Sequence, residues 1–146
     1  METKVYKVPN LAVDAIVTKK IGDQVNILLI TRGRDPFKGC YAFPGGFVDY
    51  GEDPQDACIR ELKEECSIEG KEAELICVAG KADRDPRKHV VSIVYHVSVD
   101  PEHEVQAADD AASAHWYDLK EVLGSFAMAF DHKDILNTFI KKTKII

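Results

Sequence analysis

The sequence predicts an α/β (α+β) fold in which a mixed β-sheet is covered by helices on both faces. Three observations predict it. Segments rich in Val, Ile and Leu crowd the first third of the chain, a well-marked amphipathic helix interrupts them near residue 54, and a second helical pattern closes the chain after residue 131. Strands that alternate with helices in this way are typical of layered folds with helices packed on a sheet.

Size and charge restrict the function classes. The chain has 146 residues and no repeat or linker, so we expect residues 1–146 to form a single domain. The net charge of −6 argues against a nucleic-acid partner, because such partners need a basic surface. No apolar run approaches the roughly 20 residues that span a membrane, and the N-terminus lacks a secretion signal. The four cysteines form no C-x-x-C pair, which suits a reducing cytosol and predicts a cytoplasmic protein.

The first strands precede the first helix. Residues 8–19 and 25–32 predict two strands joined by a hairpin at Gly22–Asp23. Residues 33–40 predict a loop, and residues 41–43 a short strand. That strand runs into Pro44, Gly45 and Gly46, a combination that predicts a sharp turn.

The helix that follows has a clear beginning. Asp53 can cap it, Pro54 suits its first turn, and Asp56 stands where a capping-box acid would. We expect the helix to end near Cys66. Its core-facing side is predicted by four residues at helical spacing: Cys58, Ile59, Leu62 and Cys66.

The second half of the chain predicts three more strands and a closing helix. The strands are expected at 73–82, 89–99 and 115–117, with a charged turn at 83–87 and a polar loop at 100–111. The last helix is expected to begin near Asp131. Its buried side should consist of Ile135, Leu136, Phe139 and Ile140.

Three glutamates share one face of the first helix. Glu61, Glu64 and Glu65 are spaced i, i+3 and i+4, and like charges at this spacing repel by roughly 0.2–0.5 kcal/mol per pair. Hard divalent cations such as Mg²⁺ choose carboxylate oxygens and would offset the repulsion. The alternative is a solvated charged face on which Arg60 forms an ordinary i, i+4 pair with Glu64.

The surrounding residues favour the metal site. Gly46 is followed after five residues by Glu52, and after seven more by Arg60-Glu61-Leu62-Lys63-Glu64-Glu65 and then Cys66-Ser67-Ile68. This run closely resembles the signature of the Nudix hydrolases, G-x5-E-x7-R-E-U-x-E-E-x-G-U, where U is an aliphatic residue. The resemblance implies a Nudix-type α/β/α sandwich with a mixed central β-sheet.

One fixed position departs from the signature. Ser67 stands where the family has glycine, at the end of the helix, where a left-handed backbone is often needed. Serine pays a modest steric penalty in that conformation, or ends the helix differently. We expect the departure to affect stability more than chemistry, because this position carries no metal-binding atom.

The resemblance implies roles for the matching residues. Glu61 and Glu65 would be the main metal ligands, with Glu64 joining directly or through water, and the backbone carbonyl of Gly45 would be a further ligand. Glu52 would support the site by bonding Arg60 or a metal-bound water. Arg60 would orient the carboxylates, and Gly46 would allow a close approach.

The expected chemistry is metal-assisted hydrolysis. Mg²⁺, with Mn²⁺ as a substitute, would neutralise the diphosphate and help to deprotonate the attacking water. A general base is also required, and acids of the 100–111 loop are candidates. They are Glu102, Glu104, Asp109 and Asp110.

The predicted substrate is a nucleotide. Residues 83–92 and 108–116 resemble the ADP-ribose pyrophosphatase branch, which implies cleavage of ADP-ribose to AMP and ribose 5-phosphate. Four arginines are candidates for phosphate or ribose contacts, because arginine offers a planar fork of donors: Arg32, Arg34, Arg84 and Arg87. Stacking on adenine would fall to Phe37, Tyr41 or Phe43.

Two other functions stay open. One is hydrolysis of an oxidised nucleoside triphosphate of the 8-oxo-dGTP type, and the other is a non-catalytic module that senses ADP-ribose. The full set of glutamates in the signature favours an enzyme. Relatives of this branch are often homodimers, so the resemblance also implies a homodimer.

Overall fold

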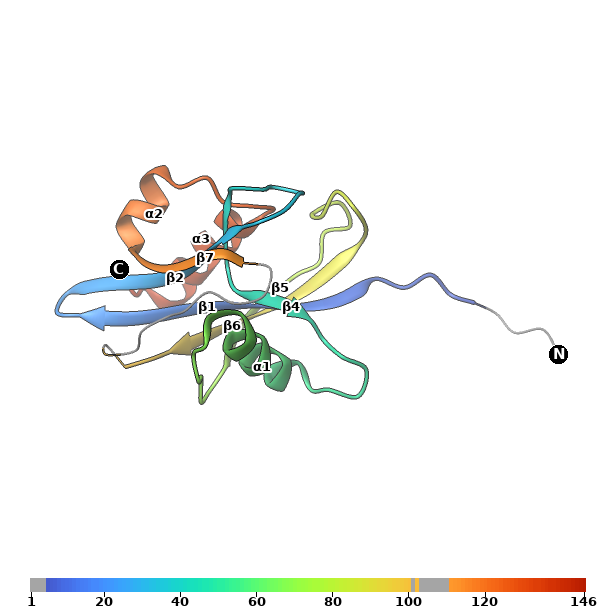
Figure 1. Cartoon of the computed structure of the whole chain (residues 1–146), viewed down its shortest axis with the longest axis horizontal. Helices are drawn as coiled ribbons and strands as arrows, with labels where there is room; N and C mark the ends of the chain where they lie inside the picture. Colours follow the sequence, from blue (N-terminus) through green and yellow to red (C-terminus); the bar gives the residue numbers. More distant parts are fainter. Residues whose placement is uncertain (1–4, 101, 103–110) are drawn as a thin grey trace.

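The computed structural model describes residues 5–100, 102 and 111–146 (Figure 1). The elements are, in chain order, β1 (Asn10–Ile21), β2 (Gln24–Arg32), β3 (Tyr41–Ala42), β4 (Gly45–Phe47), α1 (Pro54–Cys66), β5 (Glu74–Ala79), β6 (Val90–Ser98), β7 (Ala111–Asp118), α2 (Leu119–Ser125) and α3 (His132–Thr143). Among these described elements, no helix has both the length and the apolar character that a membrane span requires.

Within the described residues the strands form one sheet. Its main path runs β3-β2-β1-β6-β5, while β4 pairs with β1 and β7 pairs with β2. The two long central strands, β1 and β6, run parallel, and the other described pairs are antiparallel. The predicted mixed sheet is therefore confirmed.

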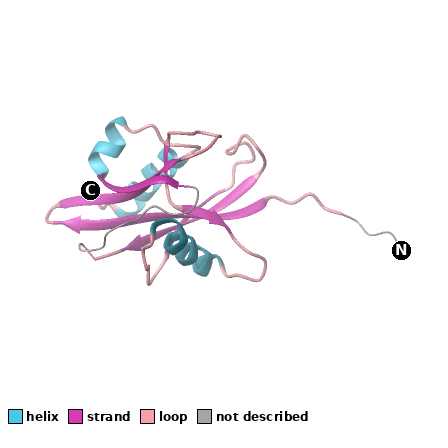
Figure 2. Cartoon of the chain, in the orientation of Figure 1, coloured by secondary structure: helices cyan, strands magenta, loops and turns pink. Residues whose placement is uncertain are grey.

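Helices cover both faces of this sheet. The ribbon shows α1 on one side and α2 with α3 on the other (Figures 1 and 2). Along β1 the side chains of Val13, Ala15 and Val17 join the core beneath α1, whereas Ile16 joins the core beneath α2 and α3. A strand buried on both faces requires apolar residues at nearly every position, which explains the continuous apolar run in the sequence.

The structure corrects three predictions. Gly45–Phe47 form strand β4, paired with β1, where the sequence predicted only a sharp turn. Strand β7 covers 111–118 rather than 115–117, because its pairing with β2 extends along almost the whole of that strand. Helix α2 was not predicted. It has seven residues and buries only Leu119 and Val122, too few for a helical period to be visible.

The ends of the two longer helices follow the sequence with one difference. Helix α1 covers Pro54–Cys66, and Ser67 after it adopts the left-handed conformation, with a φ of 57°. Asp53 holds the N-cap position, but its side chain makes no capping hydrogen bond. Helix α3 begins at His132 and buries Ile135, Leu136 and Phe139, as predicted, while Ile140 is only partly buried.

Candidate active site

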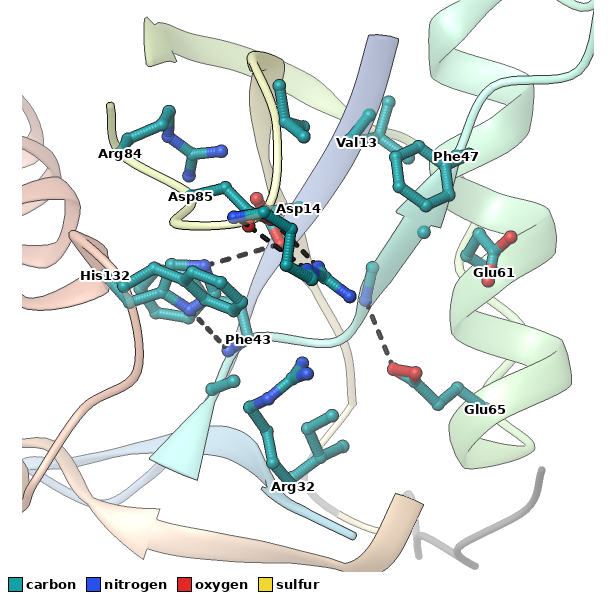
Figure 3. A pocket seen from close by; sticks show the side chains of 18 of the residues that line it. Val13, Asp14, Arg32, Phe43, Phe47, Glu61, Glu65, Arg84, Asp85 and His132 are labelled. Atoms are coloured by element: carbon teal, nitrogen blue, oxygen red, sulfur yellow. Dashed lines mark hydrogen bonds and ion pairs between the residues drawn. The ribbon is translucent and has the colours of Figure 1, made fainter. Parts of the chain in front are cut away.

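A pocket of about 520 Å³ opens beside the C-terminal half of α1, and its volume is within the usual range of small-molecule sites. Its walls come from β1, β2 and the residues after it, the β3–β4 region and one face of α1. The 80–89 loop, the first residue of β6 and the residues around the start of α3 complete them. In Figure 3, Glu61 and Glu65 project from α1 on one side, and Arg84, Asp85 and His132 lie on the other. Segments far apart in the sequence therefore meet at one cavity.

Two of the three glutamates face this pocket across the glycines of β4. The Gly45 N–H donates to Oε1 of Glu65 over 3.2 Å. The Glu61 carboxylate packs directly against Gly46: a Cβ atom at that position would lie 2.5 Å from both carboxylate oxygens. The two carboxylates stand one helical turn apart on α1, at i and i+4. Both are thus held against the backbone at residues 45 and 46.

Arg60 joins the carboxylates that surround it. Its guanidinium donates to both carboxylate oxygens of Glu52 over 2.7 and 3.0 Å, to Glu61 over 2.8 Å and to Glu64 over 3.1 Å. A further bond reaches the Phe47 carbonyl over 3.1 Å, which ties α1 to β4. The bonds to Glu52, and then to Glu61, raise the pKa of Arg60 above its ordinary value. Arg60 therefore offsets part of the repulsion among the glutamates of α1, which was expected to be offset by a metal ion.

Glu64 is placed differently from its two neighbours. Its side chain is 50% exposed, pairs with Arg60, and is not part of the pocket wall. Glu52 and Arg60 also lie outside the wall. The bond from Arg60 is one of the two contacts expected for Glu52, and it lowers the pKa of the Glu52 carboxyl.

The donors at the pocket suit a hard divalent cation. Among the described residues, no three His, Cys, Asp or Glu side chains form a closed metal cluster. Mg²⁺ does not need one, because it is commonly held by one or two carboxylates together with water and substrate phosphates. Glu61, Glu65 and the backbone beside them at Gly45 offer oxygen donors of that kind.

Arginine side chains also line the pocket. Arg32, Arg34 and Arg87 all line it. Burial, and then the positive charges of Arg87 and Arg34, lower the pKa of Arg32. The Nε atom of Arg32 donates to the Pro36 carbonyl over 2.7 Å, so this side chain is held in place. Mutual repulsion among cations is relieved by an anion, and arginine forks suit phosphate oxygens.

The fourth expected arginine is anchored to the protein. Arg84 lines the pocket, but its Nη2 and Nε donate to the two Asp131 oxygens over 2.8 and 2.9 Å, and its side chain is 5% exposed. The pair joins the 80–89 loop to the start of α3. Arg87 is oriented by Asp85, which accepts from its Nη2 and Nε over 2.8 and 3.1 Å. Arg84 thus positions the loop, and Arg87 is the arginine of this loop with an exposed side chain.

The remaining expected residues are distributed as follows. Glu102 is exposed, and it does not line the pocket. Glu104, Asp109 and Asp110 lie outside the described residues. The expected stacking aromatics contact other rings: Phe43, which lines the pocket, stacks on His132, Tyr41 stacks on Phe126, and Phe37, which is exposed, lies against Phe130.

Sequence reasoning missed Asp14 and His132, which both line the pocket. Asp14 lies in an apolar strand between Val13 and Ala15, and a charged residue at such a position is the sequence signal that could have identified it. His132 carried no signal of its own, because a single histidine at the start of a helix is common. Its place in the pocket follows only from the tertiary fold.

Comparisons with known proteins agree with this geometry. A family model described as the NUDIX domain matches residues 8–139. The ADP-ribose pyrophosphatase of Methanocaldococcus jannaschii is 42% identical over 138 residues, which are 94% of this chain and 77% of that protein. The ADPR responsive transcriptional repressor NtrR of Acinetobacter baylyi is 34% identical over 90% of this chain, which spans only 53% of the repressor.

Solved structures give the same result. A MutT/nudix family protein from Enterococcus faecalis superposes with a TM-score of 0.89 and 31% identity over 99% of this chain and 65% of that one. The NUDIX domain of Shewanella oneidensis NrtR, complexed with ADP ribose, superposes with a TM-score of 0.84 and 27% identity, covering 94% of this chain and 90% of that one.

Proposed function

This chain belongs to the Nudix family of hydrolases, and we propose that it cleaves the diphosphate of ADP-ribose to give AMP and ribose 5-phosphate. One observation carries the proposal. Glu61 and Glu65 line the same pocket as Arg32, Arg34 and Arg87, so that carboxylates and guanidinium groups share one cavity. Hydrolysis of a diphosphate would use both groups, because the carboxylates would hold a divalent cation that neutralises it and the arginines would bind its outer oxygens. The 42% identical pyrophosphatase supports ADP-ribose as the substrate.

The proposed cofactor is Mg²⁺, with Mn²⁺ as a substitute. We assign Glu61, Glu65 and the Gly45 carbonyl as its protein ligands, with Glu64 contributing through water. When bound, the cation supplies charge neutralisation and a lowered pKa for the attacking water. Gly46 lets the Glu61 carboxylate approach the backbone, and Arg60, held by Glu52, keeps that carboxylate in its rotamer.

The chain's other residues are assigned to binding and proton transfer. Arg32, Arg34 and Arg87 bind the phosphates, and Arg84 holds the loop that carries Arg87. We assign the general base to an acid that follows β6, namely Glu104, Asp109 or Asp110, because Glu102 does not line the pocket. An acid there would accept the proton of the water that attacks phosphorus.

A sensing role is the second candidate, since a 34% identical relative is a repressor that responds to ADPR. A sensor binds ADP-ribose without cutting it, and the paired carboxylates Glu61 and Glu65 then have no task. Their placement at the basic pocket favours hydrolysis.

The four cysteines are free thiols, which supports a cytoplasmic location for either function.

A substrate panel tests the proposal. The purified chain is incubated with Mg²⁺ and ADP-ribose or 8-oxo-dGTP, and AMP, ribose 5-phosphate and pyrophosphate are quantified by chromatography. We expect AMP and ribose 5-phosphate from ADP-ribose, with loss of turnover in EDTA and recovery on added Mg²⁺. Faster release of pyrophosphate from 8-oxo-dGTP would overturn the substrate. Tight binding of ADP-ribose without any turnover would support the sensor.

A further inference from the structure

Asp14 is a partly buried acid in the pocket, and the proposed hydrolysis assigns it no role. It lies near the middle of β1 between Val13 and Ala15, which are 1% and 2% exposed, and its own side chain is 13% exposed. Figure 3 shows it facing His132. A carboxylate is costly to bury, so its hydrogen-bond partners decide what it can do.

Among the described residues, the contacts of Asp14 leave its Oδ1 oxygen with accepting capacity. Ser92 donates its hydroxyl to Oδ2 over 2.5 Å. The other oxygen, Oδ1, lies 3.8 Å from Nε2 of His132, which is longer than a hydrogen bond. Each carboxylate oxygen can accept two hydrogen bonds. Because Asp14 lines the pocket, Oδ1 can therefore accept a bond from a bound molecule.

His132 presents a donor beside this acceptor. Its Nδ1 accepts the Phe43 N–H over 3.2 Å, so in the neutral ring the proton belongs on Nε2, the atom that faces Asp14. The ring is fixed by stacking on Phe43, with centroids 4.6 Å apart and planes 16° apart. Burial lowers the pKa of His132, which favours the same neutral form. The pocket wall thus carries a fixed acceptor and a fixed donor side by side.

This pair suits neighbouring hydroxyl groups better than a phosphate. A phosphate oxygen would be repelled by the Asp14 carboxylate, whereas one hydroxyl can donate to it and the next can accept from Nε2–H. Carboxylates bind ribose hydroxyls in this way in dinucleotide-binding folds. We propose that Asp14 and His132 form a subsite for two adjacent hydroxyls of a substrate ribose. This inference rests on the proposed function, because ADP-ribose supplies such diols.

ADP-ribose contains two riboses, and the products separate them. Binding of AMP is compared with that of 2′-deoxy-AMP, and binding of ribose 5-phosphate with that of 2-deoxyribose 5-phosphate, by titration calorimetry with Mg²⁺ present. We expect the wild-type chain to prefer the hydroxylated member of one pair by about tenfold, the value of one hydrogen bond to a charged group. The pair that shows the preference identifies the ribose.

Two variants test the assignment. Asp14→Asn keeps the size of the side chain and can still bond Ser92, and His132→Asn keeps an acceptor for the Phe43 N–H while removing Nε2. Each is expected to reduce the hydroxyl preference to less than about twofold. Asp134→Asn, an exposed change on α3, is the matched control and should keep the full preference. Thermal unfolding identifies any variant that fails to fold, and the other variant then decides.

Two results would overturn the subsite. The first is an absent hydroxyl preference in both wild-type pairs, and the second is an undiminished preference in the folded variants. If Asp14→Asn keeps the preference but requires more Mg²⁺, Asp14 supports the metal instead. Failure of the proposed function is read separately, as absence of ADP-ribose turnover by the wild-type chain.

Discussion

The Glu61 carboxylate occupies the space in which a side chain at Gly46 would begin. A Cβ atom there would lie 2.5 Å from each carboxylate oxygen and closer still to the carbon between them. The obstruction is the end of a flexible side chain, so Gly46→Ala can be accommodated if the carboxylate swings away. We expect the fold to survive, with a stability change below about 1 kcal/mol, and turnover of ADP-ribose to fall about 100-fold.

The matched control for this prediction is Gly124→Ala. Gly124 lies in α2, and a Cβ atom there would meet nothing within 4 Å. Turnover should stay at the wild-type level in that variant, and melting curves report stability for both. Wild-type turnover in Gly46→Ala would contradict the functional importance of the Glu61 position.

Glu64 and Glu65 are adjacent in sequence but face different surroundings, and this difference is testable. Glu65→Gln keeps an oxygen for the Gly45 N–H but removes the charge at the pocket, so we expect turnover to fall about 100-fold or more. Glu64→Gln removes a half-exposed charge outside the pocket wall, so turnover should fall less than in Glu65→Gln. Calorimetric titration with Mn²⁺ should show weaker binding to Glu65→Gln, and the exposed change Glu69→Gln should alter neither quantity. Equal losses for Glu64 and Glu65 would contradict the assignment.

The Glu52–Arg60 pair predicts how stability depends on pH. Bonds from Arg60, and then from the Asp49 N–H, lower the pKa of Glu52 in the folded chain. Its stabilising contribution is therefore complete above the unfolded pKa of about 4.3 and is lost as the pH falls through the lower folded value. Urea unfolding between pH 7 and pH 3 should show a shallower acid-side loss in Glu52→Gln than in the wild type. Parallel curves would indicate that the pair contributes nothing.

Ser67 occupies a backbone conformation that favours glycine. Its φ of 57° lies in the left-handed region, and its N–H caps α1 by donating to the Lys63 carbonyl. Glycine removes the steric cost of that conformation, so we expect Ser67→Gly to stabilise the chain by about 1 kcal/mol, or roughly 3 °C in melting temperature. Turnover should not change, because Ser67 is exposed and outside the pocket. A lower melting temperature would contradict this explanation.

The sequence predicted the elements whose signals are local. The apolar runs of β1 and β2 and the one-sided pattern of α1 depend on residues close together in the chain. These local patterns were enough to predict a sheet with helices on both faces. The pocket wall away from α1 depends on contacts between distant segments. The Arg84–Asp131 pair spans 47 positions and the Asp14–Ser92 bond spans 78, so neither leaves a periodic trace in the sequence. Because its partner Asp131 is distant in the sequence, Arg84 was predicted to contact the substrate. In the structure it pairs with Asp131 at the start of α3.

Asp85 orients the arginine that we assign to the substrate. Its side chain is 5% exposed, and its oxygens accept two bonds from the Arg87 guanidinium and one from the Arg87 N–H, whereas the Arg87 side chain is 47% exposed. Burial alone would raise the pKa of Asp85, but the bonds from Arg87 outweigh it and hold that pKa below its ordinary value. In Asp85→Asn the guanidinium loses its charged, two-oxygen partner and becomes free to rotate. We expect the KM for ADP-ribose to rise about tenfold, with a smaller change in kcat.

Two further variants separate positioning of Arg87 from a general loss of loop structure. Asp83→Asn alters an exposed acid of the same loop and should leave KM unchanged. Arg87→Gln removes the cation itself and should raise KM at least as much as Asp85→Asn does. Because both substitutions disable the same phosphate contact, the double variant should be no worse than Arg87→Gln alone. Additive losses in the double variant would mean that Asp85 acts independently of Arg87.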